Sequence, residues 1–281
     1  MNGQTGPGAM PDADSGATSV AALSHMARER LRLASEPCED ERAGGPTLIR
    51  FLGEAGWMIE PFRRPFRTID IEPAIVPKRV MLLPGFATHP VRMRYLARQL
   101  ERGGHRVKRW GLGFNWGPTQ ENFDKLNQRL EDVYLRKGEK LILVGWSLGG
   151  LFARELAKHH PDKVAKVVTM GSPFSYSPRA NNIWRIYQAI AGHRVDDLPI
   201  EAEVAEKPPV RTVALWSPRD GIVHSRAACG QAGERDRAVA LRCTHMGFNY
   251  HPQAIMAVAR ELDAERYFPD EASEDSEATT H

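Results

Sequence analysis

The sequence predicts a three-layer α/β domain built on a mainly parallel sheet. Short apolar runs recur along the chain and alternate with longer segments whose apolar residues repeat at helical spacing. Parallel strands joined by helical crossovers produce this alternation, because helices cover such a sheet on both faces and its strands are apolar throughout. With 281 residues, 42% hydrophobic and 26% charged, the chain is long enough for one substantial core.

Composition divides the chain into three parts. Residues 1–46 are rich in Gly, Pro, Ser, Ala and Asp and hold one short helical pattern around Val20–Leu33, so we expect a mobile N-terminal arm. Residues 47–268 are expected to form the α/β domain. Residues 269–281 are acidic and are expected to form a disordered tail.

The domain begins with a helical stripe that is followed by basic residues. Leu48, Phe51, Leu52 and Ala55 fall on one face of the expected helix. A stripe of this kind usually packs on its own domain, and we expect that here. Peripheral contact with an anionic membrane surface is a less favoured alternative, and a subunit interface is another.

Five apolar runs are the expected strands of the sheet: Val80–Leu83, Leu141–Val144, Val164–Met170, Thr212–Trp216 and Val239–Leu241. The connection from Gly171 to Val210 is longer than one crossover helix requires, so an insertion is expected at about residues 172–209. Its amphipathic pattern is typical of a lid over a pocket, although an ordinary helix against the sheet would also explain it.

One pentapeptide carries the strongest chemical signal. Gly145-Trp146-Ser147-Leu148-Gly149 fits the pattern G-x-S-x-G, follows the expected strand Lys140–Val144 and opens the expected helix Leu148–Leu156. In this setting the serine sits on a tight, strained turn, and glycines on either side avoid collisions with the neighbouring strand and helix. The hydroxyl then lies at the carboxyl edge of the sheet, where open α/β sheets bind ligands. Ser147 is the predicted nucleophile.

With this strand, elbow and helix, the chain resembles the α/β-hydrolase superfamily, in its lipase and esterase branch, from about Lys78 to Arg266. Leu82-Leu83-Pro84-Gly85-Phe86 resembles the segment that supplies the family's oxyanion hole, with Pro84 where many relatives have histidine. Because backbone N–H groups form that hole, the resemblance implies that Phe86 and Leu148 are the two donors.

A serine nucleophile needs a histidine base, and the base needs a carboxylate that sets its tautomer. The fold orders these residues as serine, acid and histidine. Asp220 is the expected acid, because Ser217–Val223 follows the strand Thr212–Trp216 and resembles the family's Asp-Gly-Ile-Val segment. Asp196 and Asp197 are weaker candidates, since they lie in the insertion.

Four histidines follow the expected acid. His245 lies between the last strand and the last helix, where the family's catalytic histidine resembles it, and is the expected base. His251 is the alternative. His224 is too close in sequence to Asp220, and His281 lies in the acidic tail.

These residues predict a serine hydrolase that cleaves carboxylic esters through an acyl-enzyme. The alternatives are an acyltransferase or thioesterase with the same triad, or a non-catalytic binding protein on this scaffold. Aromatic side chains near the elbow and in the insertion are expected to line an apolar acyl pocket: Trp146, Phe174, Tyr176, Trp184 and Tyr187.

The rest of the composition narrows the partners. The three cysteines match no metal or redox spacing and are expected to be free thiols, so we expect a cytoplasmic protein that needs no metal or other cofactor. No apolar run reaches transmembrane length, and the first residues resemble no targeting signal. A net charge of +3 is no evidence for nucleic-acid binding, so the expected partner is a small-molecule or lipid ester, and the oligomeric state is not indicated.

Overall fold

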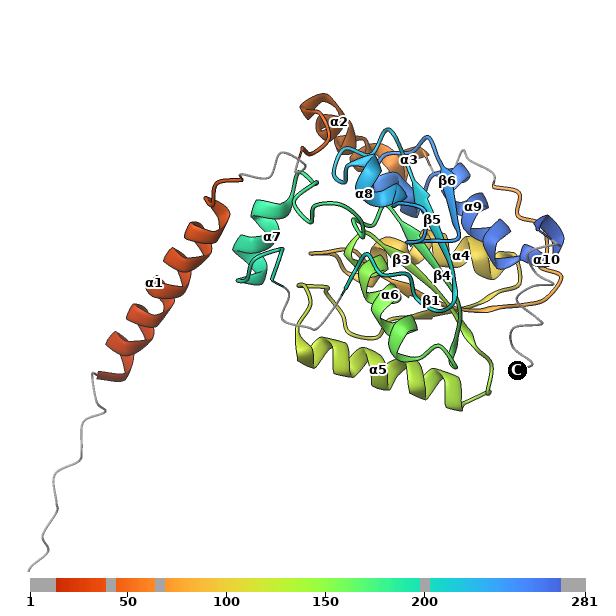
Figure 1. Cartoon of the computed structure of the whole chain (residues 1–281), viewed down its shortest axis with the longest axis horizontal. Helices are drawn as coiled ribbons and strands as arrows, with labels where there is room; N and C mark the ends of the chain where they lie inside the picture. The colour runs from red at the N-terminus through yellow and green to blue at the C-terminus, as the bar shows by residue number, and fades with distance from the viewer. Residues whose placement is uncertain (1–13, 39–43, 64–68, 198–202, 269–281) are drawn as a thin grey trace, which may run out of the picture.

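The computed structural model of the chain describes residues 14–38, 44–63, 69–197 and 203–268 (Figure 1). The acidic tail and the first part of the expected arm lie outside the described residues. The described chain forms a six-stranded parallel sheet in the order β2-β1-β3-β4-β5-β6. Its strands are β1 (Arg79–Leu83), β2 (Arg106–Arg109), β3 (Leu141–Trp146), β4 (Val164–Met170), β5 (Arg211–Trp216) and β6 (Arg237–Ala240).

Helices cover both faces of this sheet. One face carries α4 (Arg94–Arg102) and α9 (Pro252–Leu262), which share a buried core with Val80 and Leu82 of β1. The other face carries α5 (Gln120–Leu135) and α6 (Leu148–His159), which share a second core with the alternate β1 residues. Successive side chains of a strand point to opposite faces, so each central strand supplies both cores. The predicted three-layer α/β fold is confirmed.

The five expected strands correspond to β1, β3, β4, β5 and β6. Strand β2 was not predicted, because three of its four residues, Arg106, Lys108 and Arg109, are cations and none of the four is buried. It lies at the edge of the sheet and pairs only with β1. An edge strand with a solvated face does not require the apolar run that identifies a central strand.

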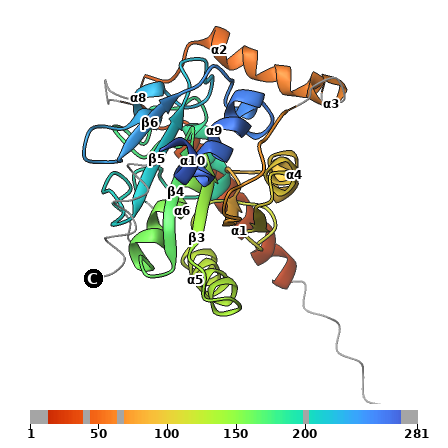
Figure 2. The same ribbon diagram turned by 90° about the vertical axis from the view of Figure 1, so that its right-hand side faces the viewer.

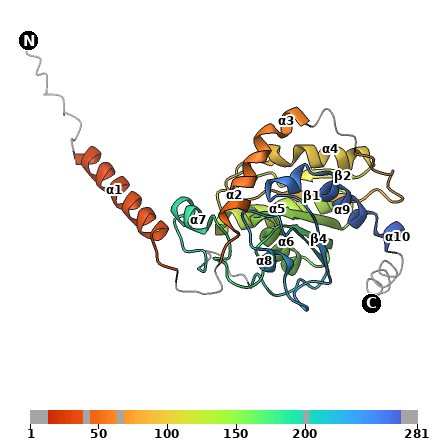
Figure 3. The ribbon, with the colours of Figure 1, turned by 90° about the horizontal axis from the view of Figure 1, so that it is seen from above.

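The insertion between β4 and β5 contains α7 (Trp184–Ala191), and the N-terminal segment is tied to it. Helix α1 (Asp14–Ala34) is longer than the short pattern around Val20–Leu33 that the sequence suggests. It projects from the domain, with its C-terminal end beside α7 (Figure 3). There the Gln188 side chain donates to the Leu33 carbonyl at 2.6 Å.

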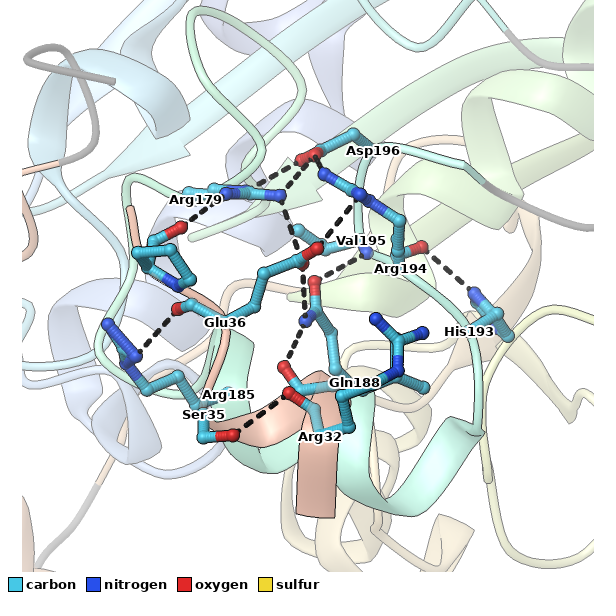
Figure 4. A network of polar contacts seen from close by, with 12 residues as sticks. Arg32, Ser35, Glu36, Arg179, Arg185, Gln188, His193, Arg194, Val195 and Asp196 are labelled. Carbon is cyan, nitrogen blue, oxygen red and sulfur yellow. Dashed lines mark hydrogen bonds and ion pairs between the residues drawn. The ribbon is translucent and has the colours of Figure 1, made fainter. Parts of the chain in front are cut away.

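A polar network joins the same two segments (Figure 4). The Glu36 carboxylate lies 2.8 Å from a guanidinium nitrogen of Arg194 and 3.5 Å from one of Arg179. Arg179 also donates from Nε to Asp196 at 3.1 Å. The end of the expected arm is therefore fastened to the insertion, whereas mobility of the arm stays a prediction.

A second N-terminal segment runs across the domain as α2 (Leu48–Gly53), the 3₁₀ helix η1 (Glu54–Ile59) and α3 (Glu60–Arg63) (Figure 2). The expected packing of its apolar stripe is found only in part: Leu48 and Leu52 are 71% and 65% exposed and Ala55 is exposed too, whereas Phe51 is half-buried. The buried residues include Glu54 instead. The segment meets the domain at other points: the backbone of Arg50 and Phe51 lies against Gly221, and the Glu54 side chain accepts the Gly221 N–H.

The remaining named helices are short. α8 (Ser225–Cys229) contacts β5, and α10 (Ala264–Tyr267) contacts α9. η3 (Pro90–Met93) and η4 (Met246–Asn249) are 3₁₀ helices. In the ranges that the structure describes, no helix is long and apolar enough to cross a membrane.

Candidate active site

Ser147 lies on the turn between β3 and α6, with φ 54° and ψ −124°. A positive φ is strained for any residue with a Cβ, and such strain concentrates at functional sites. Glycines on either side of Ser147 allow the close backbone contacts of this turn. A Cβ at Gly145 would lie 2.3 Å from the Gly149 carbonyl oxygen, and one at Gly149 would lie 2.2 Å from the Leu83 carbonyl oxygen. The tight elbow predicted from the pentapeptide is present.

Asp220 and His245 form a buried pair at the same edge of the sheet. Nδ1 of His245 lies 2.8 Å from Oδ2 of Asp220. The other carboxylate oxygen, Oδ1, accepts the N–H groups of Ile222 and Val223, each at 2.8 Å. These bonds fix the orientation of the carboxylate, and its charge favours the tautomer with the proton on Nδ1, which leaves Nε2 as the acceptor.

Opposing effects act on the pKa of His245. Burial alone would lower this pKa, but the charge of Asp220, the hydrogen bond between the two side chains and the charge of Glu54 together raise it above the ordinary value. The imidazolium is thus stabilised at the position where it would form on taking a proton from serine.

The pair is held next to the elbow by the residue before Ser147. The indole N–H of Trp146 donates to the backbone carbonyl of His245 at 3.1 Å, and the two rings are 5.6 Å apart. Gly171, at the end of β4, gives the pair room: with φ 58°, its added Cβ would lie 3.0 Å from Oδ2 of Asp220 and 3.1 Å from Nδ1 of His245.

The two expected oxyanion donors, Phe86 and Leu148, both line one cavity with Ser147. Within the described part of the chain, neither backbone N–H donates to another group. Leu148 is also the first residue of α6, where the helix dipole favours negative charge. This arrangement can stabilise an oxyanion that develops beside Ser147.

Asn115 shapes the loop that carries Phe86, and sequence reasoning missed it. It is fully buried and donates from its side chain to the Pro84 carbonyl at 2.8 Å, while its own carbonyl accepts the N–H of Ala87 at 2.6 Å. Ala87 has a positive φ of 52°, which these bonds hold. The sequence signal that could have indicated Asn115 is its position between Phe114 and Trp116, soon after the unpredicted strand β2.

The cavity beside Ser147 has a volume of about 370 Å³. Two of the five expected pocket residues, Trp184 and Tyr187, line it, along with other residues of the insertion. The other three lie outside its lining. Trp146 is buried against His245, Phe174 is buried beneath the Arg154 guanidinium at 4.2 Å, and Tyr176 turns outward and is half exposed. Residue type alone did not show which way these rings point.

The rival acids and bases have other contacts. His251 and His224 are helix N-caps, since Nδ1 of His251 accepts from the Gln253 N–H and Nδ1 of His224 from the Arg226 N–H. Asp196 pairs with Arg179, and Asp197 lies on the cavity wall. His281 is outside the described residues.

Over residues 14–38, 44–63, 69–197 and 203–268, no cluster of three His, Cys, Asp or Glu side chains is suited to hold a metal ion. The three cysteines, Cys38, Cys229 and Cys243, are all unpaired, and burial raises the pKa of the Cys243 thiol.

Curated relatives match part of the chain. The pimeloyl-(acyl-carrier protein) methyl ester esterase of Aromatoleum aromaticum is 40% identical over 67 residues, which are 24% of this chain and 24% of that protein. The esterase of the same name from Edwardsiella ictaluri is 35% identical over 68 residues, or 24% of this chain and 25% of that protein. The chain therefore spans about a quarter of the length of the curated relatives it matches.

Solved structures of an esterase and a lipase align with the chain at low identity. The mature lipase BlEst2 of Bacillus licheniformis aligns with a TM-score of 0.50 and 14% identity, over 70% of this chain and 95% of that one. A polyneuridine aldehyde esterase aligns with a TM-score of 0.44 and 15% identity, over 66% of this chain and 99% of that one.

A family model described as the alpha/beta hydrolase fold matches residues 78–199. This segment runs from β1 through the elbow at Ser147 and into the insertion, and the sheet continues beyond it in the same parallel order. The chain therefore has the α/β-hydrolase fold.

Proposed function

We propose that this protein is a serine hydrolase that cleaves carboxylic esters. The observation that carries the proposal is the strained Ser147, which lines a cavity and stands on an elbow that Trp146 ties to the buried Asp220–His245 pair. Ser147 is the nucleophile, His245 the base and Asp220 the orienting acid. Relatives named as methyl ester esterases support an ester as the substrate class.

The reaction proceeds in two halves. Ser147 Oγ attacks the acyl carbonyl while Nε2 of His245 takes the hydroxyl proton, and the carbonyl oxygen becomes an oxyanion facing the N–H groups of Phe86 and Leu148. The intermediate collapses to an acyl-enzyme as His245 returns the proton to the leaving alcohol. Water then attacks the acyl-enzyme with His245 again as base, which releases the acid and restores the serine.

The insertion supplies the acyl pocket and acts as a lid. Ile183, Trp184 and Tyr187 lie on the cavity wall, and Phe86 faces Tyr187 with ring centroids 4.8 Å apart. Aromatic and aliphatic walls favour an apolar acyl group, and the cavity volume falls in the range of small-molecule sites. The substrate is accordingly a small-molecule or lipid ester. The unpaired cysteines support a reducing, cytoplasmic location.

The test is a chain-length series of nitrophenyl esters with purified wild type and Ser147→Ala, together with labelling by a fluorophosphonate probe. Ser147→Ala should lose several powers of ten in turnover and all labelling. Ser35→Ala, which changes an exposed serine at the end of α1, is the matched control and should behave as wild type. A folded Ser147→Ala variant with more than about a tenth of wild-type turnover would refute the assignment.

A further inference from the structure

Glu54 is a buried carboxylate in a segment where the sequence shows only an apolar stripe. It is the first residue of η1, and only 6% of its surface is exposed although its helical neighbours Leu52 and Ala55 are exposed. A buried charge is costly unless it is hydrogen-bonded or paired. Its partners therefore indicate why it is there.

The Glu54 carboxylate binds three backbone N–H groups in two separate loops. Oε1 accepts from Gly221 at 2.8 Å and from His245 at 2.6 Å, and Oε2 accepts from Met246 at 2.9 Å. Gly221 directly follows Asp220 in the loop after β5, whereas His245 and Met246 belong to the loop after β6. One side chain thus bridges the loop of the acid and the loop of the base.

The backbone of the same segment lies against the acid loop. A Cβ at Gly221 would lie 2.2 Å from the Arg50 carbonyl oxygen and 2.8 Å from the Phe51 nitrogen. Because this contact requires glycine, α2 and the loop fit together closely, and Glu54 enters from a fixed direction. A second, buried link between the loops runs from Ser217 Oγ to the Cys243 carbonyl at 2.5 Å.

We infer that Glu54 is a positioning residue for the proposed hydrolase: its carboxylate clamps the Asp220 loop to the His245 loop and so sets the imidazole against its acid and its nucleophile. The inference rests on the proposed function for its catalytic consequence. Hydrogen bonds from backbone N–H groups to a carboxylate are stronger than neutral ones, and burial strengthens them further.

The charge of Glu54 has a separate, measurable effect. Asp220 and Glu54 are the two charged groups whose fields raise the pKa of His245 against the opposing effect of burial. Removing the Glu54 charge should therefore lower the pKa of His245. A purely structural glutamate, remote from the pair, would not change it.

The test compares Glu54→Gln with a matched control, Glu261→Gln. Glutamine keeps the shape of the side chain but places an NH₂ group against at least one of the three N–H donors, so the clamp loses a bond and its charge. Glu261 is an equally buried carboxylate on α9, paired with Lys166 at 3.8 Å and with Arg237 at the start of β6, at the opposite edge of the sheet. Both variants should lower the thermal unfolding temperature.

Only Glu54→Gln should alter the reaction. We expect kcat to fall between about 10- and 100-fold with KM changed little, since misplacing a catalytic group by a fraction of an ångström has effects of this order. The acid limb of kcat/KM should move to lower pH, and an NMR titration of His245 should move in the same direction. Glu261→Gln should keep wild-type kcat and an unshifted limb.

Glu54→Asp is the second variant, for use also if Glu54→Gln does not fold. It keeps the charge but is one methylene shorter, so it cannot reach both loops: kcat should fall while the acid limb stays closer to that of wild type. A folded Glu54→Gln or Glu54→Asp with wild-type kcat, or a Glu54→Gln with an unshifted His245 titration, would overturn the inference. If wild type cleaves no ester, the proposed function fails alone: an unshifted His245 titration in folded Glu54→Gln would still overturn the inference, since it tests the effect of the Glu54 charge on the base without ester turnover.

Discussion

Replacing Asp220 by asparagine tests the contact between Oδ2 of Asp220 and Nδ1 of His245. In the structure Oδ1 of Asp220 accepts two backbone N–H groups, and Oδ2 faces Nδ1 of His245. Asparagine can keep its carbonyl oxygen on the two N–H groups only by turning its NH₂ group toward Nδ1. Two donors would then face each other, so the imidazole must carry its proton on Nε2 instead.

A proton on Nε2 removes the acceptor that Ser147 needs. Turnover should therefore fall by about 10⁴-fold, which corresponds to about 5.4 kcal/mol at 1.36 kcal/mol per factor of ten. Burial already has the largest single effect on the pKa of His245, and loss of the Asp220 charge removes the largest effect that opposes it, so this pKa falls. The base must be neutral to accept a proton, and any residual activity should thus persist to lower pH than in wild type.

The assay is kcat and kcat/KM for a short-chain nitrophenyl ester between about pH 5 and pH 9, with circular dichroism to confirm that Asp220→Asn is folded. A rate within a factor of about ten of wild type would show that Asp220 does not orient the base. An acid limb that moves to higher pH would contradict the sign of the electrostatic argument, even if turnover is lost.

Three further comparisons test other parts of the structure. His245→Ala should abolish ester turnover as fully as loss of the nucleophile, whereas His251→Ala, which removes a helix cap, should lower the unfolding temperature and leave most turnover intact; the reverse result would move the base to the helix cap. Gly149→Ala should lower the free energy of unfolding in urea by about 1–3 kcal/mol, because its Cβ would meet the Leu83 carbonyl oxygen at 2.2 Å. Wild-type stability would show that the elbow has room for a side chain at residue 149. Leu52→Asp should change the unfolding free energy by less than about 0.5 kcal/mol, because Leu52 is 65% exposed; a larger loss would mean that the stripe is covered in solution.

Features that depend on nearby residues could be predicted from the sequence. The central strands are apolar because both of their faces are buried, and this leaves a continuous run in the sequence. The elbow at Ser147 needs glycine two positions before and two positions after the serine, so five consecutive residues are enough to predict it. Asp220 and His245 could be placed because each follows a strand in a fixed order.

Features that depend on distant partners could not be predicted in the same way. Asn115 holds the loop of Phe86 through Pro84, which lies 31 positions away, and the polar edge strand before it gave no apolar signal. Phe174 and Tyr176 are two residues apart, yet one is buried beneath Arg154 and the other is half exposed. Aromatic character predicts burial in general but not the direction in which a ring points.

Glu54 is a further residue whose burial depends on distant partners. Its partners are 167 to 192 positions away, so no local spacing connects them. Periodicity assigned the surrounding stripe to the interior, and the structure exposes Leu48 and Leu52 while it buries the glutamate. An apolar stripe can be left exposed at modest free-energy cost, whereas a carboxylate is buried only where hydrogen-bond donors or opposite charges pair with it. Since a buried charge must have partners, the more informative question about this segment is which backbone groups bind Glu54, the acidic residue beside the last position of the stripe.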